Sequence, residues 1–178
     1  MEFAELKPWR ELRQRLAGYF AARAQGLLAL EFALSNRSGE EFGRLQVHGP
    51  GGAEFKTVSM RAKIERNAPF RYRILTDAAE TLVANPARST SGALELKCAD
   101  RTYDARLDLL RNTAVARSFG GGEAARIAGG LTNRRYEAVF EVGDEGSLPV
   151  AVFLLYHTVA LRRRAFLAGA KGGEASNS

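Results

Sequence analysis

The stretch from Leu148 to Leu161 contains no charged side chain, and it constrains the fold of this chain more than any other feature. About 14 residues are too few for a bilayer, which needs roughly 20, and a helix that is apolar on all sides must be buried within protein. Ser147 suits an N-cap, Pro149 suits a first helical turn, and the arginines at 162–164 suit the negative end of a helix dipole. The sequence therefore predicts a buried C-terminal helix.

A pair of buried strands is the alternative for this segment. Val150, Val152 and Val159 are β-branched, and a short apolar run does not by itself distinguish a strand from a helix. The signals at both ends of the segment favour the helix.

The chain before this segment repeats short alternating stretches and turns. Apolar and polar side chains alternate in FKTVSMRAKIE and FRYRILTD, and turn-forming residues such as Gly-Pro-Gly-Gly at 49–52 separate such stretches. The first alternating stretch begins at Leu27 and continues to Leu34. About ten to twelve short strands at regular spacing are typical of a β-sandwich or a β-barrel. We therefore expect a mostly antiparallel β domain, closed by the apolar helix.

Residues 3 to 25 show helical spacing at the other end of the chain. Trp9, Leu12, Leu16 and Phe20 recur at intervals of three or four, and Pro8 lies near the start. The predicted amphipathic helix packs on the β domain, or it lies in a membrane interface with Trp9 in contact with lipid.

Composition indicates one domain in a reducing compartment. With 178 residues, of which 46% are hydrophobic, the chain can bury a core without metals, and the lone Cys98 cannot form an internal disulfide. The first residues lack the hydrophobic stretch of a secretory signal, so we expect a cytoplasmic protein. The net charge of +6 favours an anionic partner. Nucleic acid is disfavoured, because the cations do not interleave with aromatic residues in a recognisable motif.

No catalytic or metal-binding pattern is present in the sequence. Neither His48 nor His157 has a neighbouring nucleophile or carboxylate that suggests a triad, and His157 lies inside the apolar segment, which favours a core position. Asp100, Asp104 and Asp108 would line one face of a helix as magnesium ligands do, but apolar residues alternate with them, which favours a solvated strand. We expect no cofactor and no metal.

Two groups of cations are the candidate binding residues. Arg61, Lys63, Arg71 and Arg73 alternate with apolar residues on two strands of a predicted hairpin, where they would share an outer face that could hold a phosphorylated headgroup. A solvated barrel wall with acidic neighbours is the alternative. The second group, Arg162, Arg163 and Arg164, either caps the apolar helix or meets anionic lipid.

The order of these elements resembles the tubby-like superfamily, which includes phospholipid scramblases and the plant LURP-one-related proteins. The hairpins from Leu45 to Val142 and the terminal SLPVAVFLLYHTVALRRR carry this resemblance. It implies a closed antiparallel β-barrel of about twelve strands around a central hydrophobic helix, a closure that removes exposed strand edges. The expected organisation is an amphipathic helix at 1–25, a barrel domain at 27–168 with its central helix at 148–164, and a disordered tail at 169–178.

The resemblance also implies binding at membranes or to phosphoinositides, chiefly without catalysis. The sequence lacks the palmitoylated cysteine clusters of scramblases and their acidic calcium segment, so calcium-dependent scrambling is not expected. We therefore expect a non-enzymatic domain, peripheral at the inner face of a membrane, that binds anionic phospholipid headgroups or another phosphorylated or hydrophobic ligand. The alternatives are a small-molecule enzyme built in a barrel cavity and a protein-interaction scaffold.

Overall fold

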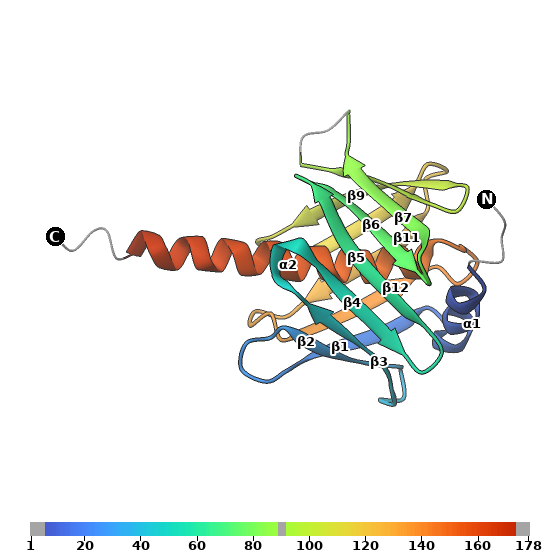
Figure 1. The fold of residues 1–178 in the computed structure, drawn as a ribbon, viewed down its shortest axis with the longest axis horizontal. Helices are drawn as coiled ribbons and strands as arrows, with labels where there is room; N and C mark the ends of the chain where they lie inside the picture. Colours follow the sequence, from blue (N-terminus) through green and yellow to red (C-terminus); the bar gives the residue numbers. More distant parts are fainter. Residues whose placement is uncertain (1–5, 89–91, 174–178) are drawn as a thin grey trace.

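The computed structural model describes residues 6–88 and 92–173, which form a closed antiparallel β-barrel with two α-helices (Figure 1). In chain order the elements are α1 (Lys7–Leu16), β1 (Tyr19–Gln25), β2 (Glu31–Ser35), β3 (Glu41–Val47), the short 3-10 helix η2 (Gly49–Gly51), β4 (Gly52–Thr57), β5 (Arg61–Ala68), β6 (Arg71–Thr76), β7 (Ala79–Pro86), β8 (Leu94–Cys98), β9 (Arg101–Asp108), β10 (Thr113–Ser118), β11 (Glu123–Gly129), β12 (Arg135–Phe140) and α2 (Ser147–Gly173).

Neighbouring strands along the chain pair with each other, and β1 closes the barrel by pairing with β12 as well as with β2. Side chains alternate between the interior and the outer wall because successive residues of a strand point to opposite faces. In β3, for example, Leu45 and Val47 are buried while Arg44 and Gln46 are exposed. The predicted closed barrel of about twelve strands is confirmed.

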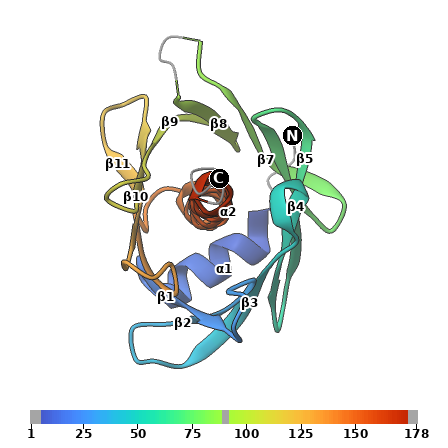
Figure 2. The same cartoon turned by 90° about the vertical axis from the view of Figure 1, so that its left-hand side faces the viewer.

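Helix α2 runs through the middle of this barrel (Figure 2). Its residues from Leu148 to Val159 are buried, and Val150, Phe153 and Leu154 are 0% exposed. The predicted buried helix is confirmed, and the alternative of two strands is wrong. A single helix satisfies its own backbone hydrogen bonds, so it can fill the barrel without strand partners.

The helix is longer than the sequence predicted. It continues past the cations at 162–164 and projects from the barrel as far as Gly173 (Figure 1). These arginines therefore lie inside the helix, and their predicted role as a C-terminal cap is wrong. The predicted tail at 169–178 also begins too early, because 169–173 are helical and 174–178 lie outside the described residues.

The N-terminal helix is shorter than the predicted 3–25, of which 3–5 lie outside the described residues. Helix α1 ends at Leu16, followed by Ala17 and Gly18 with φ of 51° and 84°, and β1 begins at Tyr19. A side chain at position 18 would place Cβ 2.9 Å from the Phe140 carbonyl oxygen, so glycine permits this close approach. The spacing of Leu16 and Phe20 fits a helix, but Phe20 begins a strand alternation with buried Ala22 and Ala24.

Two further predictions concern single strands. The alternation from Leu27 begins too early, because Leu27 and Leu28 are exposed in a turn and β2 begins at Glu31. The strand interpretation of the acidic segment is confirmed, since Asp104 and Asp108 belong to β9.

Helix α1 closes the end of the barrel at which α2 begins (Figure 1). Trp9 is 0% exposed, stacks on Phe55 with ring centroids 5.4 Å apart, and donates a hydrogen bond from Nε1 to Thr76 Oγ1 at 2.9 Å. The predicted membrane contact of Trp9 is therefore wrong, and the helix packs on the barrel. Packing on the barrel removes the apolar face of α1 from water, and the hydrophobic effect therefore favours this position of the helix.

Candidate functional site

The two ends of the barrel differ in composition. We call the end where α2 begins the entry end, and the end where it leaves the exit end. The exit end carries the loops at 26–30, 48–51, 69–70, 109–112 and 130–134, and the described residues 87–88 and 92–93 between β7 and β8. This end faces the viewer in Figure 2. The entry end carries α1 and the loops at 17–18, 36–40, 58–60, 77–78, 99–100, 119–122 and 141–146.

Exposed apolar side chains gather at the exit end. Of the 12 large hydrophobic residues exposed in the described part of the chain, eight lie in the exit loops or on the projecting part of α2. Leu27, Leu110 and Leu131 are at least 96% exposed at the tips of their loops. The complete set is Leu27, Leu28, Phe70, Leu109, Leu110, Leu131, Phe166 and Leu167. Single exposed apolar side chains are common on soluble proteins, whereas a cluster of them marks a contact surface.

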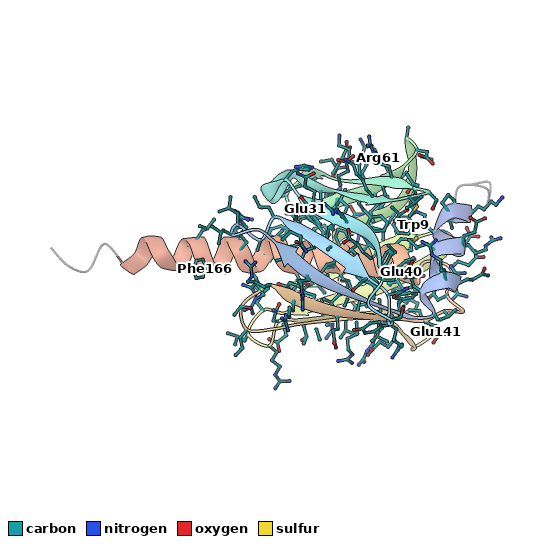
Figure 3. All side chains as sticks on the ribbon, turned by 90° about the horizontal axis from the view of Figure 1, so that it is seen from below. Trp9, Glu31, Glu40, Arg61, Glu141 and Phe166 are labelled. Carbon is teal, nitrogen blue, oxygen red and sulfur yellow. The ribbon has the colours of Figure 1, made fainter. Side chains whose placement is uncertain are left out.

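Charged residues are also distributed unequally between the two ends of the barrel. The sequence of the exit loops contains three arginines, Arg88, Arg111 and Arg134, and no carboxylate, although Arg111 pairs with Asp108 at the end of β9 at 3.7 Å. The entry loops contain six carboxylates, at Glu40, Asp77, Asp100, Glu141, Asp144 and Glu145, which Arg37 and the cations of α1 partly offset. Figure 3 shows Glu141 near α1 and Phe166 on the part of α2 beyond the opposite end. The exit end is therefore the cationic, apolar end of the molecule.

The arginines of α2 lie where the helix leaves the barrel. Arg162 donates from Nε to Asn133 Oδ1 at 2.5 Å and from Nη1 to the Leu109 carbonyl oxygen. Arg163 donates from Nη1 to the Leu28 carbonyl oxygen at 2.9 Å, and Arg164 is exposed. These acceptors are neutral, and within the described residues none of the three arginines lies within 4.0 Å of a carboxylate oxygen. Their positive charge is thus available to a ligand, as the lipid-contact interpretation requires.

A further pair of cations lies on the outer wall beside the exit end. Arg23 of β1 and Arg135 of β12 are partners in the strand register, and both are exposed. They line an open hollow of about 440 Å³ with small residues such as Ala21 and Ala33. Glu41 and Glu137 line the same hollow, but within the described residues neither arginine has a carboxylate oxygen within 4.0 Å. Like charges directly opposite each other on a sheet are destabilising, so an anion between the two arginines would relieve this repulsion.

The predicted wall cations do not form one site. Arg61 pairs with Glu54 at 3.2 Å, and Lys63 and Arg73 both pair with Glu65, at 2.8 and 2.9 Å. Hydrogen bonds from Lys63 and Arg73 hold the pKa of the Glu65 carboxyl below its usual value, which is the behaviour of a neutralised surface network. The solvated-wall alternative therefore fits these residues.

Arg71 differs from the other three wall cations. It is exposed and follows Phe70, so it stands at the exit end, whereas Arg61 begins β5 at the opposite end of the same hairpin. The four cations share the outer face, as the alternation predicts, but they are spread along the length of the hairpin.

The interior holds a histidine without catalytic neighbours. His157 is 3% exposed, stacks on Phe153 with ring centroids 5.5 Å apart, and meets the ring of Tyr72 edge-on at 5.3 Å. Its Nδ1 has no hydrogen-bond partner among the described residues, and burial lowers its pKa to about 4. His157 is a core residue, as its position in the apolar segment suggests.

A buried polar contact at the entry end is structural. The Tyr103 hydroxyl donates to Asp144 Oδ1 at 2.7 Å, and the same oxygen accepts from the Gly146 backbone N–H at 3.0 Å. Arg101 lies 3.4 Å from the other carboxylate oxygen, and burial raises the pKa of Tyr103. These contacts fix the loop that leads into α2. The described residues contain no group of three or more metal-ligating side chains.

Neither the exposed leucines nor the pair of opposed arginines was predicted from the sequence. The leucines could have been found, because Leu27 follows Gly26, Leu110 precedes a turn and Leu131 follows Gly130, and apolar residues within turn-forming sequences are exposed at loop tips. Arg23 and Arg135 are 112 positions apart in sequence, and only strand pairing brings them together.

Comparisons with known proteins support the fold. No protein-family model matches the chain, and no curated protein matches it in sequence. Among solved structures, the X-ray structure of a protein from Arabidopsis thaliana, AT5G01750, is similar with a TM-score of 0.53 and 8% identity. The similarity covers 79% of this chain and 90% of the Arabidopsis chain. Within the described residues, no helix has the length and hydropathy needed to cross a membrane.

Proposed function

We propose that this protein is a non-enzymatic, peripheral membrane-binding domain whose exit end docks on an anionic lipid surface. One observation carries the proposal: the exposed apolar loop tips and the unneutralised arginines occupy the same end of the barrel. Apolar side chains enter the boundary between headgroups and acyl chains, and arginines beside them bind lipid phosphates. The orientation that we propose is the barrel axis upright on the membrane, with the projecting part of α2 pointing into it.

The projecting part of α2 suits this orientation. Arg162, Arg163 and Arg164 come first, at the level of the loops, and Ala165, Phe166 and Leu167 follow further from the barrel. In an upright arrangement the cations meet the headgroups and the exposed aromatic and aliphatic side chains reach the acyl region. Without a membrane, the side chains of Phe166 and Leu167 would remain exposed to water.

The assignment of the chain to a protein superfamily is part of this proposal. We infer that the chain is a remote relative of the tubby-like superfamily, because the barrel with a helix through its centre matches what the sequence resemblance implied. A cytoplasmic location at the inner face of a membrane follows from that inference, because the cytoplasmic leaflet carries the anionic lipids.

The alternatives find less support. An enzyme built in the barrel cavity requires space that α2 fills with Phe153, Leu154 and other fully buried side chains. A scaffold that presents an apolar face of the N-terminal helix requires that face to be exposed, whereas Trp9, Leu12 and Leu16 are buried.

The test is cosedimentation of the full-length protein with vesicles of phosphatidylcholine, with and without phosphatidylserine. We expect binding to the phosphatidylserine vesicles only, and weaker binding at high salt. Each cation near the surface contributes about 1 kcal/mol, so charge reversal of Arg164 should weaken binding at least about fivefold. A Leu110→Ser, Leu131→Ser variant tests the apolar contribution and should also bind more weakly.

A matched control separates this surface from net charge alone. Arg61→Glu makes the same charge change as Arg164→Glu but acts on the barrel wall, and Val58→Ser removes an exposed apolar side chain at the entry end. Both controls should bind vesicles nearly as the unaltered protein does. Equal losses in the control and exit-end variants, or no binding to phosphatidylserine vesicles, would contradict the proposal.

A further inference from the structure

A groove opens beside α2 at the exit end. Docking of this end on a membrane does not by itself explain why the groove is there. It has a volume of about 280 Å³ and lies between the loop at 26–30, the loop at 130–134 and the projecting side of the helix. Most of its lining is apolar: Leu27, Leu28, Ala29, Val159, Phe166 and Leu167. A convex contact with a flat bilayer would leave this concave space empty.

Along α2 the groove runs from a buried residue to exposed apolar ones, with one cation between them. Val159, which is 4% exposed, lies nearest the barrel interior, and Phe166 and Leu167 lie about two helical turns further along α2. Arg163 lies between them, and its described partner is the Leu28 carbonyl oxygen at 2.9 Å. Thr132 and Asn133 are the other polar residues of the lining. An apolar groove that contains one cation complements a hydrocarbon chain with an anionic head: the head pairs with Arg163, and the chain lies along Phe166 and Leu167.

We propose that this groove binds a single acyl chain of an anionic amphiphile, with the head beside Arg163. The inference rests on the proposed function, since the docked orientation would bring the groove to the lipid. Charge and size select this occupant: the volume is too small for a folded partner, and within the described residues no carboxylate lines the groove or pairs with Arg163. A free carboxylate amphiphile and one chain of a bilayer phospholipid share this chemistry.

The probe is a series of monomeric carboxylates, octanoate, decanoate and dodecanoate, titrated calorimetrically into the full-length protein without vesicles. We expect the affinity to increase by up to about fourfold for each added methylene that still contacts the apolar wall of the groove. Thr132→Trp places an indole in the groove from an exposed loop position and should abolish the binding. Val58→Trp adds the same side chain at an exposed entry-end position and should leave it unchanged.

A second variant guards against a local change in the 130–134 loop. Phe166→Ser removes part of the wall from α2 and should weaken decanoate binding, with an unchanged circular dichroism spectrum. Absence of decanoate binding to the unaltered protein, or equal binding to the Thr132→Trp variant, would overturn the inference. So would a dimer in light scattering that Thr132→Trp dissociates, because the groove would then be covered by a second copy of the chain.

The vesicle experiment separates the two proposals. Vesicle binding without decanoate binding would refute the groove and leave membrane docking intact. Decanoate binding without vesicle binding would refute docking and assign the groove to free amphiphiles. Reduced vesicle binding of Thr132→Trp, alongside lost decanoate binding, would support a phospholipid chain as the occupant.

Discussion

Arg23 and Arg135 face each other across strands β1 and β12, with both side chains exposed on the outer wall beside the exit end. Elsewhere on the barrel wall, cations commonly stand next to acidic partners, as Arg73 stands next to Glu65 at 2.9 Å. A directly opposed pair of like charges lowers stability, and such a pair is expected where an anionic partner binds.

Reversing one charge of this pair should therefore change stability and membrane binding in opposite directions. Arg135→Glu converts a repulsive cross-strand pair into an attractive one, so we expect the free energy of unfolding to rise by about 0.2–1 kcal/mol. Binding to phosphatidylserine vesicles should weaken in the same variant. Urea denaturation and cosedimentation measure the two effects. Arg61→Glu, which loses its pairing with Glu54, should instead lower stability slightly.

Trp9 should contribute strongly to stability and not to membrane binding. Its indole is buried against Phe55, so Trp9→Ala should lower the free energy of unfolding by about 3–5 kcal/mol. Trp9→Phe retains most of the packing but removes the hydrogen bond to Thr76, and a smaller loss is expected. Denaturant titration gives both values. The prediction fails if Trp9→Phe remains folded but no longer binds vesicles.

His157 should make the barrel less stable in mild acid. Burial lowers its pKa from 6.5 to about 4, so the unfolded chain takes up a proton at a higher pH than the folded protein. Above pH 6.5 the group is neutral in both states and has no effect. As the pH falls from 6.5 toward 4, the free energy of unfolding should decrease, by up to about 3 kcal/mol from this residue.

The comparison that tests this effect is His157→Phe against the unaltered protein. The variant keeps an aromatic ring beside Phe153 and removes the titrating group, so its stability should fall less between pH 6.5 and 4.5. His48→Gln, at an exposed position, is the control and should keep the original slope. Parallel slopes for all three proteins, measured by urea denaturation at each pH, would contradict the prediction.

Two adjacent glycines should differ sharply in their tolerance of alanine. A Cβ at position 52 would lie 2.1 Å from the Ile64 carbonyl oxygen in the neighbouring strand, whereas a Cβ at position 51 meets nothing within 4 Å. Gly52→Ala must displace the β4–β5 pairing, and we expect a loss of about 1–3 kcal/mol or more. Gly51→Ala should be close to neutral. Thermal melts of the two variants give the comparison, and similar melting temperatures would refute it.

Much of the fold could be predicted because it depends on local patterns. Alternation of apolar and polar residues between Leu45 and Val142 predicts strands whatever their partners are, and the uncharged stretch from Leu148 to Leu161 predicts a buried helix. The helix boundaries were less predictable. Residues 3–25 satisfy helical spacing throughout, but pairing of Phe20 with Ala138 makes the second part a strand. Tertiary pairing outweighed local preference there.

The candidate site was predictable only in part, because it depends on which turns share an end of the barrel. Arg162, Arg163 and Arg164 were identified from their position after the apolar segment, and they lie at the exit end. The wall cations were identified from alternation, which places residues on a face but gives no acidic neighbours. Glu65 neutralises Lys63 and Arg73 because strand geometry brings it beside both.

The sequence by itself determined that this chain buries a charge-free helix within a β domain, since hydrophobic burial follows from side-chain chemistry and local period. The tertiary structure alone decided that α2 leaves the barrel at the end where Leu27, Leu110 and Leu131 are exposed and no loop carries a carboxylate. Antiparallel pairing sends alternate turns to opposite ends of a barrel, so strand order, and not any local motif, gathers these residues into one surface.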